Sequence, residues 1–203
     1  MARFHLARLT LNGEMVLQTQ PPAVSMGKAT IELPTGSFLQ ATEAAQDFLA
    51  DYVAEALKGA KNVADLFCGV GPFALRLAQS SKVFAADSDK PAIEALDQAR
   101  RLTRGLKQLT AKRRDLFREE MTRYELADYD AVVLDPPRAG ALNQVRELAA
   151  SKVKTIAMIA CDPKTFARDA ATLIAGGYRM KDLMVVDQFV HSTHIEIAAT
   201  FSH

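Results

Sequence analysis

The chain has 203 residues, of which 49% are hydrophobic and 24% charged, as in an ordinary globular enzyme with one domain and a sizeable core. It contains no run of eighteen apolar residues and no apolar stretch with a cleavage site at its charged start, which excludes a membrane span and a signal peptide. Its two cysteines, Cys68 and Cys161, argue against a disulfide framework and a four-cysteine metal or iron–sulfur site, and with the missing export signal predict a cytoplasmic location.

The first part of the chain is predicted to form short strands. Residues 4–11 and 14–18 flank Asn12-Gly13, a strong hairpin signal because both residues tolerate positive φ. A strand over 29–33 ends in a Pro-Thr-Gly turn. Thr42 can then cap a long amphipathic helix that runs to about Lys58. We therefore expect a short β-rich segment over 1–36, followed by a larger domain over 37–203.

The larger domain shows a regular alternation of strand-like apolar runs and helical segments. This pattern is typical of a parallel sheet with helices on both faces. The last two runs follow one another without a helix, which predicts a terminal antiparallel hairpin. The predicted class is therefore α/β, Rossmann-like, with a mostly parallel seven-stranded sheet; its strands are 63–67, 83–86, 108–111, 131–134, 155–160, 184–189 and 194–201.

A glycine loop follows the first strand of this domain. Gly69 and Gly71 let the backbone turn sharply against a ligand, and Pro72 suits the first turn of a helix whose free N–H groups favour a carboxylate. Asp87, at the end of the next strand, can accept hydrogen bonds from ribose hydroxyls, and Asp115, after the third strand, can reach an adenine amino group. Ligands of such sheets bind outside the carboxyl ends of the strands.

Two cofactors fit this loop. Residues 69–74 match the G-x-G-x-x-A dinucleotide fingerprint, with Asp87 near the expected acidic position, as in a nicotinamide dehydrogenase. However, Asp65 lies four residues before the first glycine, as in the loop of class I methyltransferases, which this segment resembles. The terminal hairpin also resembles the end of that fold. Both features favour S-adenosylmethionine as the cofactor.

A second loop closes the fourth strand. Asp135-Pro136-Pro137-Arg138 is stiff and lacks backbone donors at both prolines. Methyltransferases that modify amino groups of bases carry a related Asp-Pro-Pro-aromatic motif. Because Arg138 replaces the aromatic residue, exocyclic amino methylation becomes the alternative and not the leading hypothesis.

Here the sequence resembles the RNA 5-methyluridine methyltransferases. Their ordered motifs are Phe-x-Gln, Asp-Leu-(Tyr/Phe)-Cys-Gly-x-Gly, Asp-Pro-Pro-Arg-x-Gly, Ser-Cys-Asn-Pro and His-x-Glu. This chain offers Phe38-Leu39-Gln40, Asp65 to Gly71, Asp135 to Gly140, Cys161-Asp162-Pro163 and His194-Ile195-Glu196, in that order. The ordered set is far more specific than any single motif.

The resemblance implies methylation of carbon 5 of a uridine in rRNA or tRNA. Cys161 would be the nucleophile that adds to carbon 6, and Glu196 the base that removes the carbon 5 proton. Pro136, Arg138 and His194 would contact the RNA. The expected cofactor contacts, from the loop and the resemblance together, are Gln40, Asp65, Phe67, Gly69, Gly71, Asp87, Asp115 and Asp135.

The chain departs from the family pattern in two places. Asp162 replaces asparagine, and its carboxylate should raise the pKa of the Cys161 thiol unless it is paired or points away. The RNA-binding barrel that family members often carry at the N-terminus has no counterpart here, so residues 1–36 resemble a remnant of the family's middle region. A catalytically silent domain that binds cofactor or RNA is therefore the second alternative.

Other residues have plainer interpretations. Cys68 is expected to be a packing residue. His191, His194 and Glu196 are metal-ligand types, but 191 falls on the other face of a strand from 194 and 196, so no metal is predicted. Nine lysines and arginines between Arg100 and Arg123 could hold phosphates, although a solvated helical face also explains them. The net charge of +1 neither supports nor excludes a nucleic-acid partner.

Overall fold

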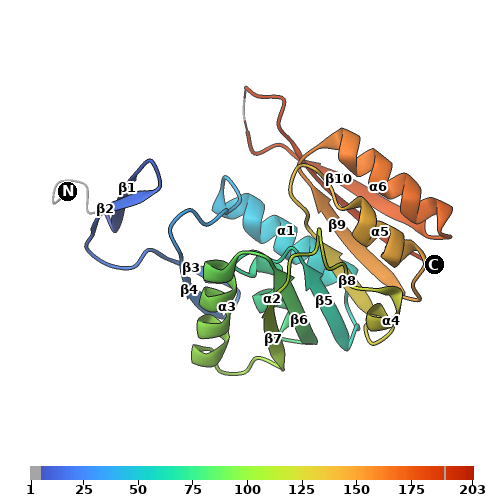
Figure 1. Ribbon diagram of the computed structural model, residues 1–203, viewed down its shortest axis with the longest axis horizontal. Coiled ribbons are helices and arrows are strands. Elements are labelled where there is room, and N and C mark those ends of the chain that lie inside the picture. The colour runs from blue at the N-terminus through green and yellow to red at the C-terminus, as the bar shows by residue number, and fades with distance from the viewer. Residues whose placement is uncertain (1–5, 190) are drawn as a thin grey trace.

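The computed structural model describes residues 6–189 and 191–203, and most of them surround one seven-stranded sheet (Figure 1). The strand order is β10-β11-β9-β8-β5-β6-β7. All neighbouring pairs from β9 to β7 are parallel, whereas β11 runs antiparallel to both β9 and β10. This confirms the predicted fold class. The strands are β5 (Asn62–Leu66), β6 (Lys82–Asp87), β7 (Leu109–Arg113), β8 (Ala131–Leu134), β9 (Thr155–Ala160), β10 (Arg179–Val186) and β11 (Glu196–Ser202).

Helices cover both faces of the sheet, because the central strands are apolar on both sides. All four residues of β8 are buried, as expected for a parallel strand between two helical layers. One core lies between the sheet and the first three helices, and a second between the sheet and the other three (Figure 1). The helices are α1 (Glu43–Ala56), α2 (Pro72–Leu77), α3 (Lys90–Leu102), α4 (Arg123–Leu126), α5 (Leu142–Ala149) and α6 (Pro163–Ala175).

Helix α1 begins where its cap predicts. The Thr42 hydroxyl accepts a hydrogen bond from the Ala45 backbone N–H at 3.1 Å, which satisfies one of the free donors of the first turn. Leu49 and Val53, four positions apart, are fully buried against the sheet. The segment just before this cap therefore reaches the edge of the sheet where ligands bind.

Two antiparallel hairpins precede α1. β1 (Arg8–Leu11) pairs with β2 (Glu14–Gln18) across Asn12-Gly13, whose φ angles of 50° and 83° confirm the predicted turn. Residues 4 and 5 of the predicted first strand lie outside the described residues. β4 (Ala29–Glu32) was predicted, whereas its partner β3 (Ala23–Met26) was not. The boundary at residue 36 between the β-rich segment and the larger domain stays a prediction.

The last hairpin differs from its prediction in position. β10 begins at Arg179 and ends at Val186, whereas the predicted strand covered 184–189. β10 is the edge strand and almost all of its residues are exposed, so no alternation of buried and exposed positions marked its start. Among the described residues, no helix is both long enough and apolar enough to cross a bilayer.

Candidate active site

A cavity of about 560 Å³ opens at the carboxyl ends of the parallel strands, the edge at which the sequence places its ligand. Predicted site residues from six separate segments line it: Gln40, Phe67, Gly69, Asp87, Asp135, Pro136, Arg138, Cys161 and Glu196. Such convergence of distant polar groups on one concave surface is the usual mark of a ligand site.

The glycine loop forms one wall of this cavity. Phe67, Gly69 and Gly71 all have positive φ, at 63°, 51° and 87°. A Cβ on Gly71 would lie 2.5 Å from a methyl carbon of Leu96 in α3, so only glycine lets the loop approach that helix. Asp87 holds the loop in place, because its Oδ2 accepts a hydrogen bond from the Gly69 N–H at 2.8 Å. The same carboxylate keeps free lone pairs for a ligand.

Several carboxyl groups gather beneath and around the cavity. Asp65 is fully buried, and neither of its side-chain oxygens has a hydrogen-bond partner among the described residues. Burial, with the nearby charge of Asp135, raises the pKa of Asp65 well above its ordinary value. Burial and the charges of Glu196 and Asp87 raise the pKa of Asp135 to about 7. Four carboxyl groups at one site, whose ionised forms disfavour one another, favour a cationic ligand there.

Asp115, a predicted cofactor contact, lies in the turn beside the cavity and is not among the residues that line it. Its Oδ1 accepts a hydrogen bond from the Phe117 N–H at 3.0 Å, and its Oδ2 pairs with Arg118 at 3.4 Å. These bonds order the turn after β7, and the turn places the Phe117 ring on the cavity wall. The rings of Phe117 and Phe67 lie 5.3 Å apart and tilted, which leaves an aromatic surface suited to a flat ring.

The register of β11 brings Cys161 and Glu196 together. Ile197 pairs with Ala160 in the antiparallel β9–β11 ladder, so the residues one step beyond, Glu196 and Cys161, face each other at the cavity end. Glu196 is only 4% exposed, and burial raises its pKa, while the side chain of Gln188 opposes the shift. Burial and the charges of Glu196 and Asp135 also raise the pKa of the Cys161 thiol.

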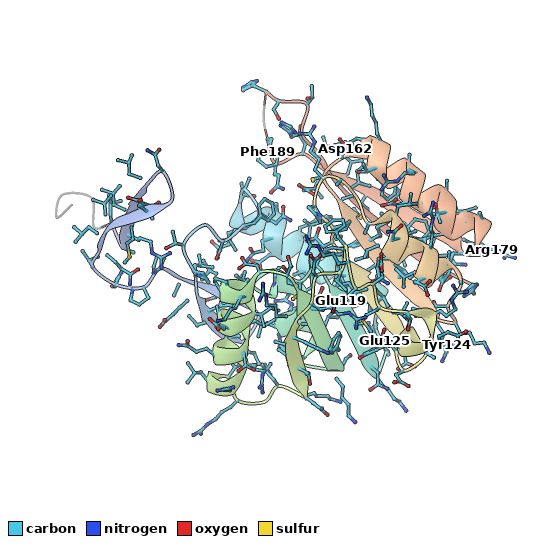
Figure 2. All side chains as sticks on the ribbon, in the orientation of Figure 1. Glu119, Tyr124, Glu125, Asp162, Arg179 and Phe189 are labelled. Carbon is cyan, nitrogen blue, oxygen red and sulfur yellow. The ribbon has the colours of Figure 1, made fainter. Side chains whose placement is uncertain are left out.

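The Asp162 carboxylate is paired. Pairing is one condition, expected from the sequence, under which this carboxylate does not raise the pKa of the Cys161 thiol. Its Oδ1 caps α6 by accepting from the Lys164 and Thr165 N–H groups, both at 3.0 Å, and its Oδ2 pairs with Arg138 at 3.4 Å (Figure 2 labels Asp162 at the start of α6). These bonds lower the pKa of Asp162. Arg138 in turn opposes the rise in the pKa of Cys161.

Helix α6 also holds the loop that carries Asp135. The buried Asp169 accepts a hydrogen bond from the Ala141 N–H at 2.9 Å, and the Thr165 hydroxyl donates to the Arg138 carbonyl at 3.1 Å. Arg168 pairs with Asp169 and donates a hydrogen bond to the Ala139 carbonyl of this loop. The same helix therefore anchors the Cys161 loop and the Asp135 loop.

Alkylation of Cys161 by iodoacetamide should accelerate about tenfold per pH unit between pH 6 and pH 8. Only the thiolate reacts, and its fraction rises tenfold per unit below a pKa that burial and two carboxylates have raised. Arg138→Ala should slow the reaction at each pH, because the guanidinium that stabilises the thiolate is lost. Mass spectrometry of the Cys161 peptide measures the rate, with the buried Cys68 as an internal control. A rate that levels off below pH 7 would contradict the raised pKa.

Four predicted residues do not line the cavity. Asp65 is fully buried in β5, Gly71 is the glycine of the loop that packs against α3, Asp115 orders the turn after β7, and His194 is exposed, with its ring 6.1 Å from the Phe189 ring. Among the residues that the structure describes, no group of three His, Cys, Asp or Glu side chains could hold a metal. Five of the nine basic residues between 100 and 123 pair with carboxylates of this chain: Arg100, Arg101, Arg114, Arg118 and Arg123.

Two residues near the cavity were missed by sequence reasoning. Phe117 follows Asp115 by two positions, and no motif marks it. Gln188 lies in the loop between β10 and β11, and its side chain hydrogen-bonds Gln40, 148 residues away. An aromatic residue two positions after Asp115, in the turn that follows a strand, is a weak signal that could have indicated Phe117. Nothing in the sequence pairs Gln188 with Gln40.

Comparison with known proteins identifies the group to which the chain belongs. The model of the tRNA (uracil-5-)-methyltransferase family matches residues 1–202. An uncharacterized RNA methyltransferase of Rhizobium meliloti is 49% identical over 96% of this chain and 47% of its own length. A 23S rRNA (uracil(1939)-C(5))-methyltransferase of Chromohalobacter salexigens is 43% identical over 68% of this chain and 29% of its own length.

A solved structure agrees in fold. The tRNA (uracil-54, C5)-methyltransferase of Pyrococcus abyssi, in complex with S-adenosyl-L-homocysteine, superposes with a TM-score of 0.80 and 26% identity, over 93% of this chain and 46% of that one. The chain thus spans about half the length of the first relatives it matches. The match across nearly the whole chain shows that it belongs to the tRNA (uracil-5-)-methyltransferase family.

Proposed function

We propose that this chain methylates carbon 5 of a uridine in RNA, with S-adenosylmethionine as methyl donor and Cys161 as a covalent nucleophile. The observation that carries the proposal is the β9–β11 register, which sets Cys161 opposite the buried Glu196 at the cavity. A nucleophile beside a carboxyl group of raised pKa is the pair that an addition–elimination reaction needs.

The residues around the cavity fit S-adenosylmethionine. Its sulfonium and ammonium groups are cations, and the buried Asp65 with Asp87, Asp135 and Glu196 makes this end of the sheet acidic. Asp87 would accept hydrogen bonds from the ribose hydroxyls, and the Phe67 and Phe117 rings would offer a surface for adenine. When bound, this cofactor supplies an electrophilic methyl group. The structural relative from Pyrococcus abyssi, solved with the demethylated cofactor, supports this assignment.

Cys161 makes the target carbon reactive. Carbon 5 of uracil is a weak nucleophile, and addition of the Cys161 thiolate to carbon 6 forms an S–C6 bond and pushes the ring electrons towards carbon 5 and the carbonyl oxygen. Carbon 5 can then take the methyl group. Arg138, which is exposed at the cavity and opposes the rise in the thiol pKa, supports the thiolate.

Glu196 completes the reaction by removing a proton. After methylation, carbon 5 carries both the methyl group and its original hydrogen. The Glu196 carboxylate takes that hydrogen as a proton, the carbon 5–carbon 6 double bond forms again, and the S–C6 bond breaks to return the thiolate. Because burial raises the pKa of Glu196, its carboxylate is a stronger base than an exposed one.

The RNA must present an extruded uridine to this cavity. A base stacked in a helix cannot reach both Cys161 and Glu196, so the nucleotide has to leave its stack. Pro136 and Arg138 lie on the cavity wall towards Cys161 and are proposed to contact it. His194, exposed in the loop before β11, is proposed to contact the flanking RNA. The named relatives act on rRNA and tRNA, and we propose one of these as the substrate.

A mixture of tRNA and rRNA that contains 5-fluorouridine tests the proposal. Fluorine replaces the proton that Glu196 must remove, so the reaction should stop at the covalent stage with RNA attached to Cys161. We expect a band of retarded mobility on a denaturing gel, dependent on S-adenosylmethionine and absent in Cys161→Ala. Cys68→Ala is the matched control and should keep the band, because the Cys68 thiol, although it touches the cavity, is buried and donates to the Gly69 carbonyl.

Three results would speak against parts of the proposal. Methylation of ordinary RNA without a trapped adduct on fluorinated RNA would contradict the covalent mechanism. Methylation that survives Cys161→Ala would favour modification of an exocyclic amino group. Cofactor binding with neither methylation nor adduct would favour a silent binding domain.

A further inference from the structure

A pair of glutamine amides joins two distant segments at the cavity. Gln188, in the loop between β10 and β11, accepts a hydrogen bond on its Oε1 from the Ala41 backbone N–H at 3.0 Å. Its Nε2 donates to the Oε1 of Gln40. Gln40 lines the cavity, whereas Gln188 is not among its lining residues. The two hydrogen bonds therefore connect the chain before α1 with the chain before β11.

These bonds fix the direction of both amides. A backbone N–H can only donate, so the carbonyl oxygen of Gln188 must face Ala41 and its NH₂ group must face Gln40. Gln40 must then turn its own carbonyl oxygen towards Gln188. The NH₂ group of Gln40, which makes no hydrogen bond within the part of the chain that the structure describes, remains as a donor for the cavity. The usual ambiguity of amide orientation is absent here.

The Gln40 amide offers a hydrogen-bond donor beside three carboxyl groups of the cavity. Asp87, Asp135 and Glu196, which also line the cavity, present acceptor oxygens and would repel an anionic group. Gln188 also opposes the raised pKa of Glu196, which puts the amide pair at the transfer end of the cavity and not at the Phe67–Phe117 end. A ligand with one carboxylate at that end needs a donor such as the Gln40 amide.

We propose that Gln188 is a positioning residue that turns the Gln40 NH₂ group towards the carboxylate of the cofactor's amino-acid part. The inference rests on the proposed cofactor and not on the chemistry at carbon 5. Without the Gln188 donor, Gln40 can rotate and present its carbonyl oxygen instead. A hydrogen bond to a charged group is then replaced by a repulsive contact.

Calorimetry with two ligands tests this role. S-adenosylhomocysteine carries the carboxylate, whereas 5′-methylthioadenosine lacks the whole amino-acid part. Gln188→Glu can still accept from Ala41 but cannot donate to Gln40, so we expect roughly 10- to 100-fold weaker binding of S-adenosylhomocysteine. Binding of 5′-methylthioadenosine should change by less than about twofold, the scatter expected where no contact is lost. Gln188→Met, a neutral variant of similar size, should show the same selectivity with a smaller loss.

Two controls separate orientation from charge and from folding. Gln108→Glu adds the same charge just before β7, outside the cavity, and should bind both ligands as the parent does. In a Gln40→Ala background, Gln188→Glu should no longer discriminate between the two ligands. Equal weakening of both ligands, no weakening of either, or discrimination that persists without Gln40 would each overturn the proposal. A parent chain that binds neither ligand would overturn the cofactor assignment itself.

Discussion

Glu196→Gln should convert the chain into a trap for ordinary, unfluorinated RNA. Glutamine keeps the size of the side chain but cannot take the carbon 5 proton, so the methylated base stays bound to Cys161. Turnover should fall by about 10² to 10⁴, the usual contribution of a positioned acid or base. With a radiolabelled methyl donor, the label should migrate with the protein on a denaturing gel. This outcome requires the buried, cavity-facing carboxyl group seen at the start of β11.

Glu147→Gln is the matched control for this experiment. Glu147 is a partly buried glutamate on α5 that pairs with Arg123 and does not line the cavity, so its replacement should leave turnover intact. Cys161→Ala in the Glu196→Gln background should remove the labelled complex. Normal turnover by Glu196→Gln, or a loss of turnover with no labelled complex, would refute Glu196 as the base that acts after methyl transfer.

Asp135→Asn should make the ligand-free chain more stable above pH 7. The pKa of Asp135 is about 7 in the folded chain against an ordinary value of 3.8, so the folded state holds the proton more tightly. The stability that this group contributes is full below about pH 4 and is lost as the pH rises through 7. Three pKa units correspond to about 4 kcal/mol, and partial exposure reduces the expected gain at pH 8 to about 2–4 kcal/mol.

Urea unfolding at pH 4 and pH 8 measures this effect. The parent and Asp135→Asn should have equal free energies of unfolding at pH 4 and should separate at pH 8. Asp162→Asn is the opposite control, because the pKa of Asp162 is lowered and its charged form is favoured by the cap and by Arg138. That variant should gain nothing at pH 8. Equal stability of Asp135→Asn and the parent at pH 8 would show that Asp135 ionises freely.

The parallel part of the sheet was predictable because burial on both faces leaves continuous apolar runs. The run over β8 is fully buried, and β9 is buried at all but its first residue, and both begin at their predicted residues. The edge strand β10 has no continuous apolar run, because nearly all of its residues are exposed to solvent. The short helix α4 was also missed, although Thr122 and Glu125 form a capping box that a search for this spacing would have found.

Within the site, the residues at strand ends followed from the alternation of strands and helices, whereas loop residues were predicted only where a motif marks them. The ends of β6, β8 and β9 meet at one edge, so Asp87, Asp135 and Cys161 reach the cavity as the alternation implies. The direction of a loop side chain depends on hydrogen bonds to distant segments. Asp115 turns to the Phe117 N–H for that reason, and Gln188 meets Gln40. Such partners cannot be read from one sequence.

The anchoring of two loops by α6 also decides where engineering will be tolerated. Gly140 sits so close to Arg168 and Asp169 that a Cβ would lie 2.5 and 2.6 Å from their side-chain atoms, so this junction accepts almost no variation. The loop before β11 has no comparable anchor to that helix in the described contacts. A mutant library designed to change the proposed RNA specificity should therefore randomise residues around His194. It should leave the junction at Gly140 unchanged, because a small shift of α6 would displace the Cys161 thiol and Asp135 together.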